Sequence, residues 1–340
     1  MCPAHMHSNS DAGKGSSRRS FAVGAATLLA SLPAMLGTAT AGDAPPSSPE
    51  LALQRGGDYS FMIGTIRVTA LSDGTVPLDL HKLLIGSTTV HTDALLQESF
   101  LVNPVEVSVN EWVFRMGERV VLVDAGTGQL FGAGYGGKLL QSLATAGVKP
   151  EEVTDVLITH MHPDHSGGLL QSDKLMFPAA TIHVGQPDLA FFMDRSNAAR
   201  TGADISFFDE AIKTFKPYID AGKVKSFDRP TEIVAGLTAT LEPGHTPGSA
   251  FYSLKSGGHS ILFVGDVIHI AAVQFTDPSI AITYDVDPKG AVAVRERFFP
   301  MFAHDRTLIA VPHMSFPGVD HIRPAGRGFE WVPVDYVNRI

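Results

Sequence analysis

A cluster of three histidines and one aspartate within six positions constrains this chain more than any other feature. The segment 159–168 reads THMHPDHSGG and directly follows the apolar run Val156–Ile158. Such a short run between polar and turn-forming residues predicts a buried strand, with the cluster at its carboxyl end, where α/β proteins place their sites. Imidazole nitrogens and carboxylate oxygens suit divalent ions. Four ligands are too many for one catalytic ion with an open position, so the cluster suggests two ions side by side.

Three more polar residues follow apolar runs in the same way. The runs 237–241, 261–264 and 308–311 lead, in that order, to His245, Asp266 and His313. A single histidine after a strand is usually an ordinary loop histidine. Because the pattern occurs four times, we expect these side chains to meet at one edge of the fold.

The remaining pattern mixes strands with helices. We predict a hairpin from Val107–Met116 and Arg119–Asp124, and helices over Lys138–Ala146 and Ala291–Phe302. The tripeptide Ser72–Gly74 predicts a turn, and residues 77–105 predict a loop with a short helix. The first strand segment is expected over residues 61–71. Strands mixed with helices favour a layered α/β fold, and we find no domain boundary from residue 59 to residue 340.

Residues 1–41 have the features of a twin-arginine-type signal peptide. Arg18 and Arg19 precede an uncharged apolar run, and the small residues 39–41 predict cleavage after Ala41. Pro33 and Gly37 interrupt the run, which disfavours a transmembrane anchor. We therefore expect export to the periplasm or secretion, no stable membrane insertion after signal removal, and a flexible leader over residues 42–58.

Charge and cysteine content limit the partners and the ligands. Removal of residues 1–41 leaves 23 basic and 34 acidic side chains, a net charge of −11, which opposes nucleic acid as the main partner. The single cysteine, Cys2, lies in the signal. Any metal site in the mature chain must therefore use histidine, aspartate or glutamate.

The four-part pattern resembles the metallo-β-lactamase superfamily. The resemblance implies an αββα sandwich, with two mixed sheets flanked by helices and two divalent ions at one edge. Zinc is the first expectation, with manganese, cobalt or iron as alternatives. Residue by residue, it implies His160, His162 and His245 around one ion, Asp164, His165 and His313 around the other, and Asp266 bridging both. Asp124, which ends the run Val120–Val123, matches a family position that orients a ligand histidine.

Segments 70–75, 271–275 and 313–318 look like the methyl parathion hydrolase and lactonase branch of that superfamily. This likeness implies that Phe131, Phe192 and Phe207 line the substrate pocket and that His269 points toward it. The branch's phosphotriesterase carries an aliphatic residue at the position of His269, so a histidine there fits a lactone or aryl ester better. Family analogy also implies a homodimer.

The resulting hypothesis is a dinuclear metal-dependent hydrolase that opens lactones or cleaves aryl esters by attack of a metal-bridging hydroxide. Asp164 or Asp266 would accept the proton, and the substrates would be small and neutral. A phosphotriesterase of the methyl parathion type is the alternative. β-Lactam and thioester hydrolysis are less favoured, and the charge disfavours a nuclease. A non-catalytic binding module is disfavoured because all seven ligand positions are filled.

The glycine-rich segment 132–137 matches a dinucleotide-binding pattern, but it begins too far beyond the strand ending at Asp124 to form such a site.

Overall fold

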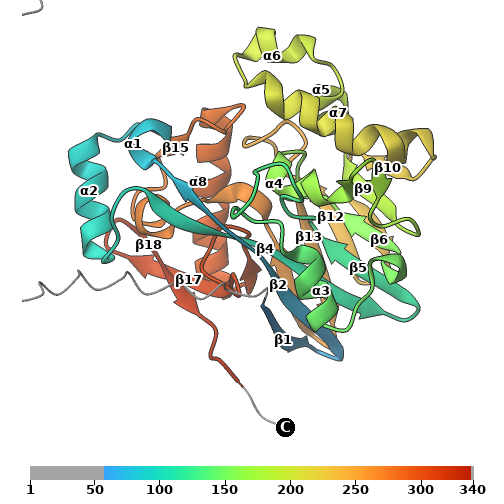
Figure 1. Cartoon of the computed structure of the whole chain (residues 1–340). Helices are drawn as coiled ribbons and strands as arrows, with labels where there is room; N and C mark the ends of the chain where they lie inside the picture. Colours follow the sequence, from blue (N-terminus) through green and yellow to red (C-terminus); the bar gives the residue numbers. More distant parts are fainter. Residues whose placement is uncertain (1–56, 338–340) are drawn as a thin grey trace, which may run out of the picture. The chain divides into compact units, whose positions relative to one another are not determined.

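Two seven-stranded mixed sheets lie face to face in the computed structural model, which describes residues 57–337 (Figure 1). The first sheet has the order β1 (Asp58–Ile63), β2 (Ile66–Leu78), β4 (Val105–Met116), β5 (Arg119–Val123), β6 (Asp155–Leu157), β9 (Thr181–Gly185) and β10 (Val224–Phe227). The second has the order β11 (Thr231–Val234), β12 (Leu237–Leu241), β13 (Ala250–Ser256), β14 (His259–Phe263), β16 (Ile309–Ala310), β17 (Val319–Ala325) and β18 (Gly328–Pro333). Two short pairs, β3 (Leu84–Ile85) with β15 (Ala281–Ile282) and β7 (Leu170–Gln171) with β8 (Lys174–Leu175), lie outside these sheets.

Helices cover the outer faces of both sheets. Those of the structure are α1 (Leu80–Leu83), α2 (Thr89–Glu98), α3 (Leu139–Thr145), α4 (Pro163–Ser166), α5 (Gln186–Phe192), α6 (Ser196–Thr201), α7 (Ile205–Asp220) and α8 (Pro288–Asp305). Buried side chains of α3, α5 and α7 pack on the first sheet, and those of α8 pack on the second. This arrangement is the αββα sandwich that the family resemblance implies, and it confirms the layered α/β fold that the sequence pattern predicts.

Aromatic side chains hold the two sheets together. Phe263 of β14 lies with its ring centroid 5.6 Å from that of Trp112 and 5.9 Å from that of Phe114, both on β4. All three side chains are almost completely buried. Burial of large apolar surfaces on the inner faces of both sheets is the main source of stability for such a sandwich. The packing also fixes the distance between the edges of the two sheets.

Helix α7 illustrates how local sequence sets an outer layer. The side chain of Asp204 caps its first turn by accepting a hydrogen bond from the backbone N–H of Ser206 (2.9 Å). Phe208, Phe215 and Tyr218 recur at helical spacing and are fully buried against the first sheet. The helix therefore packs its apolar face on the sheet, and its first turn reaches His162, which follows β6, through the ring of Phe207 at 5.0 Å.

The predicted hairpin and the two predicted helices are confirmed as β4–β5, α3 and α8. The predicted turn at Ser72–Gly74 is wrong, because β2 continues through it with a bulge opposite β4. The bulge turns the carboxylate of Asp73 inward, where it accepts hydrogen bonds from the backbone N–H groups of Thr127, Gly137 and Leu139 and from the Thr127 hydroxyl (2.7–2.9 Å).

Other differences concern the two ends of the domain. Residues 77–105 contain the end of β2 and the elements α1, β3 and α2, which is more regular structure than the short helix predicted. The edge hairpin of β17 and β18 was not predicted, and the first strand begins at Asp58. The predicted signal, 1–41, lies outside the described residues, as does the leader except for residues 57 and 58. From residue 57 to residue 337, no helix is long and apolar enough to cross a membrane.

Asp73→Ala should lower the free energy of unfolding by about 3 kcal/mol or more, because three backbone N–H groups lose their acceptor. Thr127→Val, which removes only the hydroxyl donor, should cost about 1 kcal/mol. Urea denaturation of the two variants and the parent measures both effects. An Asp73→Ala variant as stable as the parent would show that this carboxylate does not hold the loop.

Candidate metal centre

The first group of predicted ligands meets where strands of both sheets end. His160 and His162 follow β6 of the first sheet, and His245 follows β12 of the second. The Nδ1 atom of His162 lies 3.1 Å from His160 Nε2 and 2.9 Å from His245 Nε2, and the last two nitrogens are 3.2 Å apart. Three imidazole nitrogens therefore point at one another from residues up to 85 positions apart.

The second group lies beside the first. Asp164 and His165 stand on α4, and His313 follows β16. The Oδ2 atom of Asp164 is 3.4 Å from His165 Nε2 and 3.3 Å from His313 Nε2. Asp266, with these three residues, completes a set whose ligand atoms all lie within 4.8 Å of one another.

Asp266 lies between the two groups. Its Oδ2 atom is 3.6 Å from His245 Nε2 and 3.7 Å from His160 Nε2 on one side, and 3.0 Å from His313 Nε2 on the other. Its Oδ1 atom is 3.3 Å from His165 Nε2. One carboxylate thus faces both sets of imidazoles, which is the position expected of a bridging ligand.

These residues fit divalent cations. Three imidazole nitrogens that converge at about 3 Å cannot satisfy one another pairwise, since a neutral ring carries one donor and one acceptor. Among the described residues, His165 Nε2 and Asp266 Oδ1 are buried without a hydrogen-bond partner. Buried lone pairs aimed at a common point are what a cation with nitrogen and oxygen ligands requires.

The ionisation states agree with this reading. Burial lowers the pKa of His160 and of His162 well below the usual value, so both rings are neutral and can offer a lone pair. Burial alone would raise the pKa of Asp266, but the charges of His165 and His313 hold it well below the usual range. Against the effect of burial, the carboxylates of Asp266 and Asp164 raise the pKa of His165 well above the usual value and that of His313 to about 10. The site therefore combines neutral rings at His160 and His162 with an ionised Asp266, and a cation bound by His165 and His313 would displace their protons.

Outer partners hold several of the ligand rings by their second nitrogen. The Nδ1 atom of His165 is 2.9 Å from Asp124 Oδ2, and that of His245 is 2.8 Å from Asp285 Oδ1. The backbone carbonyl of Ser108 lies 2.9 Å from His313 Nδ1. Such contacts fix the tautomer and the orientation of a ligating ring. Asp124 stands where the sequence analysis expects it, contacting a histidine rather than joining either group.

Sequence reasoning missed two of the supporting carboxylates. Asp285 follows the two-residue strand β15, and so short an apolar run gives no usable signal. Asp188, near the start of α5, accepts hydrogen bonds from the Met161 N–H (3.0 Å), the Thr246 hydroxyl (2.9 Å) and the Gly248 N–H (2.5 Å). It thus ties together the loops that carry His162 and His245. Burial, partly offset by these bonds, raises the pKa of Asp188 to about 6.

Glycine allows the close packing of the first ligand loop. A Cβ atom at Gly168 would lie 2.0 Å from the carbonyl oxygen of Ala125, and one at Gly248 would lie 2.4 Å from the backbone nitrogen of Asp188. Both contacts are far inside van der Waals distance, so no other residue fits without movement of the backbone. The glycines after His165 and His245 are therefore part of how the two loops reach each other.

A cavity of about 300 Å³ lies over the centre and is lined by Asp164, Asp266, His313 and the apolar side chains of β2 and β4. This cavity is also lined by three residues that were predicted for the substrate pocket, Phe131, Phe207 and His269. Phe192 borders a neighbouring cavity of about 440 Å³ but is only 1% exposed and packs mainly among helix residues. Its ring meets that of His162 edge to face at 5.6 Å.

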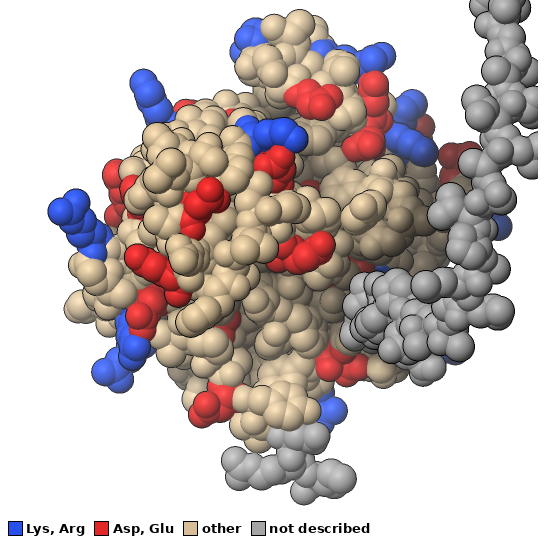
Figure 2. Space-filling view, turned by 60° about the vertical axis from the view of Figure 1, so that its left-hand side comes forward, with Lys and Arg blue, Asp and Glu red and all other residues tan. Residues whose placement is uncertain are grey.

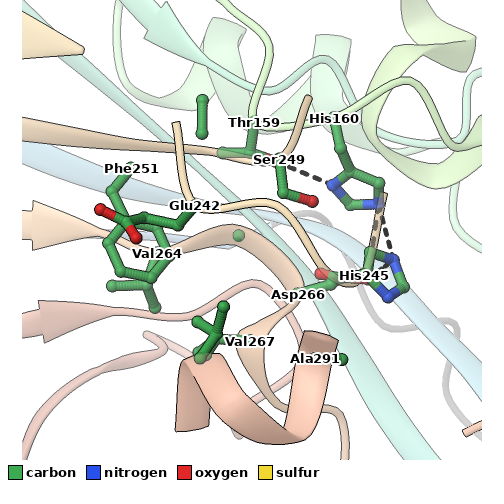
Figure 3. A pocket seen from close by; sticks show the side chains of 13 residues that line it. Thr159, His160, Glu242, His245, Ser249, Phe251, Val264, Asp266, Val267 and Ala291 are labelled. Carbon is green, nitrogen blue, oxygen red and sulfur yellow. Dashed lines mark hydrogen bonds and ion pairs between the residues drawn. The ribbon is translucent and has the colours of Figure 1, made fainter. Parts of the chain in front are cut away.

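Figure 3 shows a small space on one side of the centre, where the rings of His160 and His245 face each other and Asp266 lies beside His245. The small space there, about 10 Å³, also contacts Ser249. The Ser249 hydroxyl accepts a hydrogen bond from the Thr246 N–H at 2.9 Å. Ser249 therefore supports the turn that presents His245, and its hydroxyl is not among the ligand groups.

Comparison with known proteins agrees with the geometry. The family model of the metallo-beta-lactamase superfamily matches residues 104–313. The crystal structure of a hydrolase of the beta lactamase superfamily, AbOPH, is 32% identical, with a TM-score of 0.79 over 84% of this chain and 100% of that one. AidC, described as a dizinc quorum-quenching lactonase and solved with a product, is 26% identical, with a TM-score of 0.76 over 83% of this chain and 99% of that one.

One curated relative is a ribonuclease. The ribonuclease TTHA0252 of Thermus thermophilus is 26% identical over 180 residues, which are 52% of this chain and 38% of the ribonuclease. The chain thus spans well under half the length of this relative.

Asp285→Ala should weaken the affinity for one of two bound metal ions by about 10- to 100-fold, because His245 loses the partner that orients it. Asp287→Ala is the matched control: its carboxylate caps α8 through the Gly290 N–H, so its loss should cost about 1 kcal/mol of stability and leave metal affinity unchanged. Zinc competition titrations with a chelator measure the affinities. Equal affinities in both variants would remove Asp285 from the centre.

Proposed function

The chain belongs to the metallo-beta-lactamase superfamily, and from this premise we propose that it is a dinuclear metal-dependent hydrolase that opens lactones or cleaves aryl esters. The observation that carries the proposal is the meeting of seven histidine and aspartate side chains in two groups around Asp266, beneath a largely apolar cavity. Similarity to a lactonase over 83% of the chain supports the lactone substrate.

Two divalent ions in such a centre would lower the pKa of water toward neutrality and polarise an ester carbonyl. The side chains of the protein would supply the ligands of both ions. His160, His162 and His245 would hold one ion, Asp164, His165 and His313 the other, and Asp266 would contact both. No serine or cysteine nucleophile is required.

A carboxylate that lines the cavity would accept the proton released in the reaction. Asp164 and Asp266 both line it, and the Asp164 side chain is 16% exposed while that of Asp266 is 3% exposed. Asp164 reaches the cavity more fully and approaches only the second histidine group. It is therefore the better placed of the two to exchange a proton with solvent after each turnover.

The walls of the cavity favour neutral substrates. Val76, Leu78, Val107 and Phe131 form an apolar side, and neither this cavity nor its neighbour is lined by lysine or arginine. The acidic residues Asp164 and Asp204 line it instead. An anionic group of a substrate that lies beyond the reach of the metal ions would therefore have no basic side chain to pair with.

The surface charge disfavours RNA as substrate in the same way. Figure 2 shows lysine and arginine side chains scattered singly over the face in view, with acidic residues between them. Nucleic-acid binding relies on clustered basic side chains that neutralise phosphates. The proposal therefore differs from the activity of the partly matching ribonuclease.

A neutral phosphotriester is the second candidate substrate. The same centre can present hydroxide to a tetrahedral phosphorus, and the same apolar walls would accept aryl groups. The buried polar ring of His269 in the cavity wall favours the carbonyl substrates, because an aliphatic side chain would suit a phosphotriester better. A non-catalytic binding module would not need all seven positions.

Export and assembly are further parts of the proposal. The twin-arginine pair at residues 18 and 19 supports export to the periplasm or secretion, by a route that suits an enzyme already loaded with metal. A homodimer is proposed by family analogy alone. Zinc is the ion of first choice, with manganese, cobalt and iron as alternatives that suit the same ligands.

The substrate class is tested by kcat/KM for a δ-lactone, an aryl acetate, a neutral phosphotriester, a β-lactam and single-stranded RNA on metal-loaded protein. We expect the lactone or the aryl ester to lead, with the carboxylated β-lactam at least about 10-fold lower and RNA uncleaved, because the cavity has no basic residue. Highest activity toward RNA or the β-lactam would refute the proposal.

His162→Ala and Asp266→Ala should each abolish hydrolysis, because each removes a group that faces the centre. Circular dichroism should show an intact fold for both. The exposed His259, on β14, offers a matched control, and His259→Ala should keep full activity. Chelation should likewise remove activity and added zinc or manganese should restore it. Near-normal turnover of the fully metal-stripped protein would rule out the mechanism.

A further inference from the structure

His269 is a buried imidazole with no hydrogen-bond partner on either ring nitrogen among the described residues. It lies in the segment between β14 and α8, three positions after Asp266, and is 2% exposed. Buried polar atoms in proteins are nearly always hydrogen-bonded, so a buried imidazole without a hydrogen bond on either nitrogen requires an explanation.

The ring is placed against the metal centre. Its Nε2 atom lies 3.2 Å from Asp266 Oδ2, the oxygen that faces His160, His245 and His313. Its ring centroid is 5.1 Å from that of His245, and the ring stacks on His313 at 5.2 Å with an angle of 16°. His245, Asp266 and His269 have donor atoms within 4.8 Å of one another, a third group that overlaps the first two.

The backbone at this position is held firmly. The side-chain oxygen of Gln274 accepts hydrogen bonds from the N–H groups of His269 (2.8 Å) and Ile270 (3.2 Å). The Gln274 amide donates in turn to the carbonyl of Ile280 at 3.1 Å. These bonds aim the Cα–Cβ direction of His269 at the centre, although no hydrogen bond holds the Nδ1 atom of its ring.

That missing outer contact distinguishes His269 from three of the predicted histidine ligands. His165, His245 and His313 each have Nδ1 against a carboxylate or a carbonyl at 2.8–2.9 Å. Such partners fix the tautomer and strengthen the ring as a ligand. A ring with a free Nδ1 can approach an ion through Nε2 but is held there less tightly than its neighbours.

We propose that His269 is an additional, exchangeable metal ligand that shares an ion with His245 and Asp266. It occupies a coordination position on the side of the 300 Å³ cavity and gives up that position when a substrate oxygen enters. This inference rests on the metal centre of the proposed function, but not on the identity of the substrate.

The test is proton NMR in water on the protein loaded with cobalt(II), where the N–H protons of ligating imidazoles are strongly shifted. His269→Leu, which keeps similar bulk without a donor, should lose one shifted, exchangeable resonance and weaken the affinity for one cobalt ion by at least about 10-fold. Phe131→Leu, in the same cavity wall, should keep every shifted resonance and both affinities. His269→Asn serves as the second variant if His269→Leu does not fold.

A His269→Leu spectrum with all shifted resonances retained, and both affinities within twofold of the parent, would overturn the proposal. So would a variant that loses lactone kcat/KM alone, since His269 would then bind substrate and not metal. The readout needs no turnover, so a protein inactive toward lactones can still confirm the ligand. Conversely, a result that excludes His269 as a metal ligand would leave the lactone proposal unchanged.

Discussion

The crowding of imidazoles around the Asp266 carboxylate is the contact on which the rest of the structure depends. Its two oxygens lie within 3.7 Å of nitrogens from five histidines, all of them buried. His160 follows a strand of the first sheet, and His245 and His313 follow strands of the second, so these rings meet only if the sandwich packs correctly. The aromatic contacts of Phe263 with Trp112 and Phe114 therefore set the geometry of the centre as well as contributing to stability.

A layer of buried carboxylates gives the centre its rigidity. Asp73, Asp124, Asp188 and Asp285 each accept at least two hydrogen bonds from loops that carry or adjoin the ligands. Burying four acidic groups is costly unless each is fully paired. Such a layer reduces the motion of the ligand rings, which matters because a displacement of 1 Å can greatly reduce catalysis. The ring of His269 receives no hydrogen bond from this layer.

The sequence predicted the strand-end pattern well because buried strands leave a strong local signal. The runs before His160, His245, Asp266 and His313 are apolar, and each proved to be a strand. The prediction from sequence was wrong at Asp73. The tripeptide there is typical of a turn, but it forms a bulge within β2. A turn and a bulge both need the same residue types, and only the neighbouring strand decides between them. The β17–β18 hairpin was missed because its strands are only partly buried.

The sequence by itself determined which side chains could hold metal, since residue type and position after a strand are local properties. Only the tertiary structure decided what supports them. Asp285 lies 40 residues from His245, and Asp188 lies 60 from Gly248, so no spacing rule connects these pairs. A ring nitrogen has a hydrogen-bond partner only if the packing brings a distant polar atom within about 3 Å of it. The local sequence does not determine that distance.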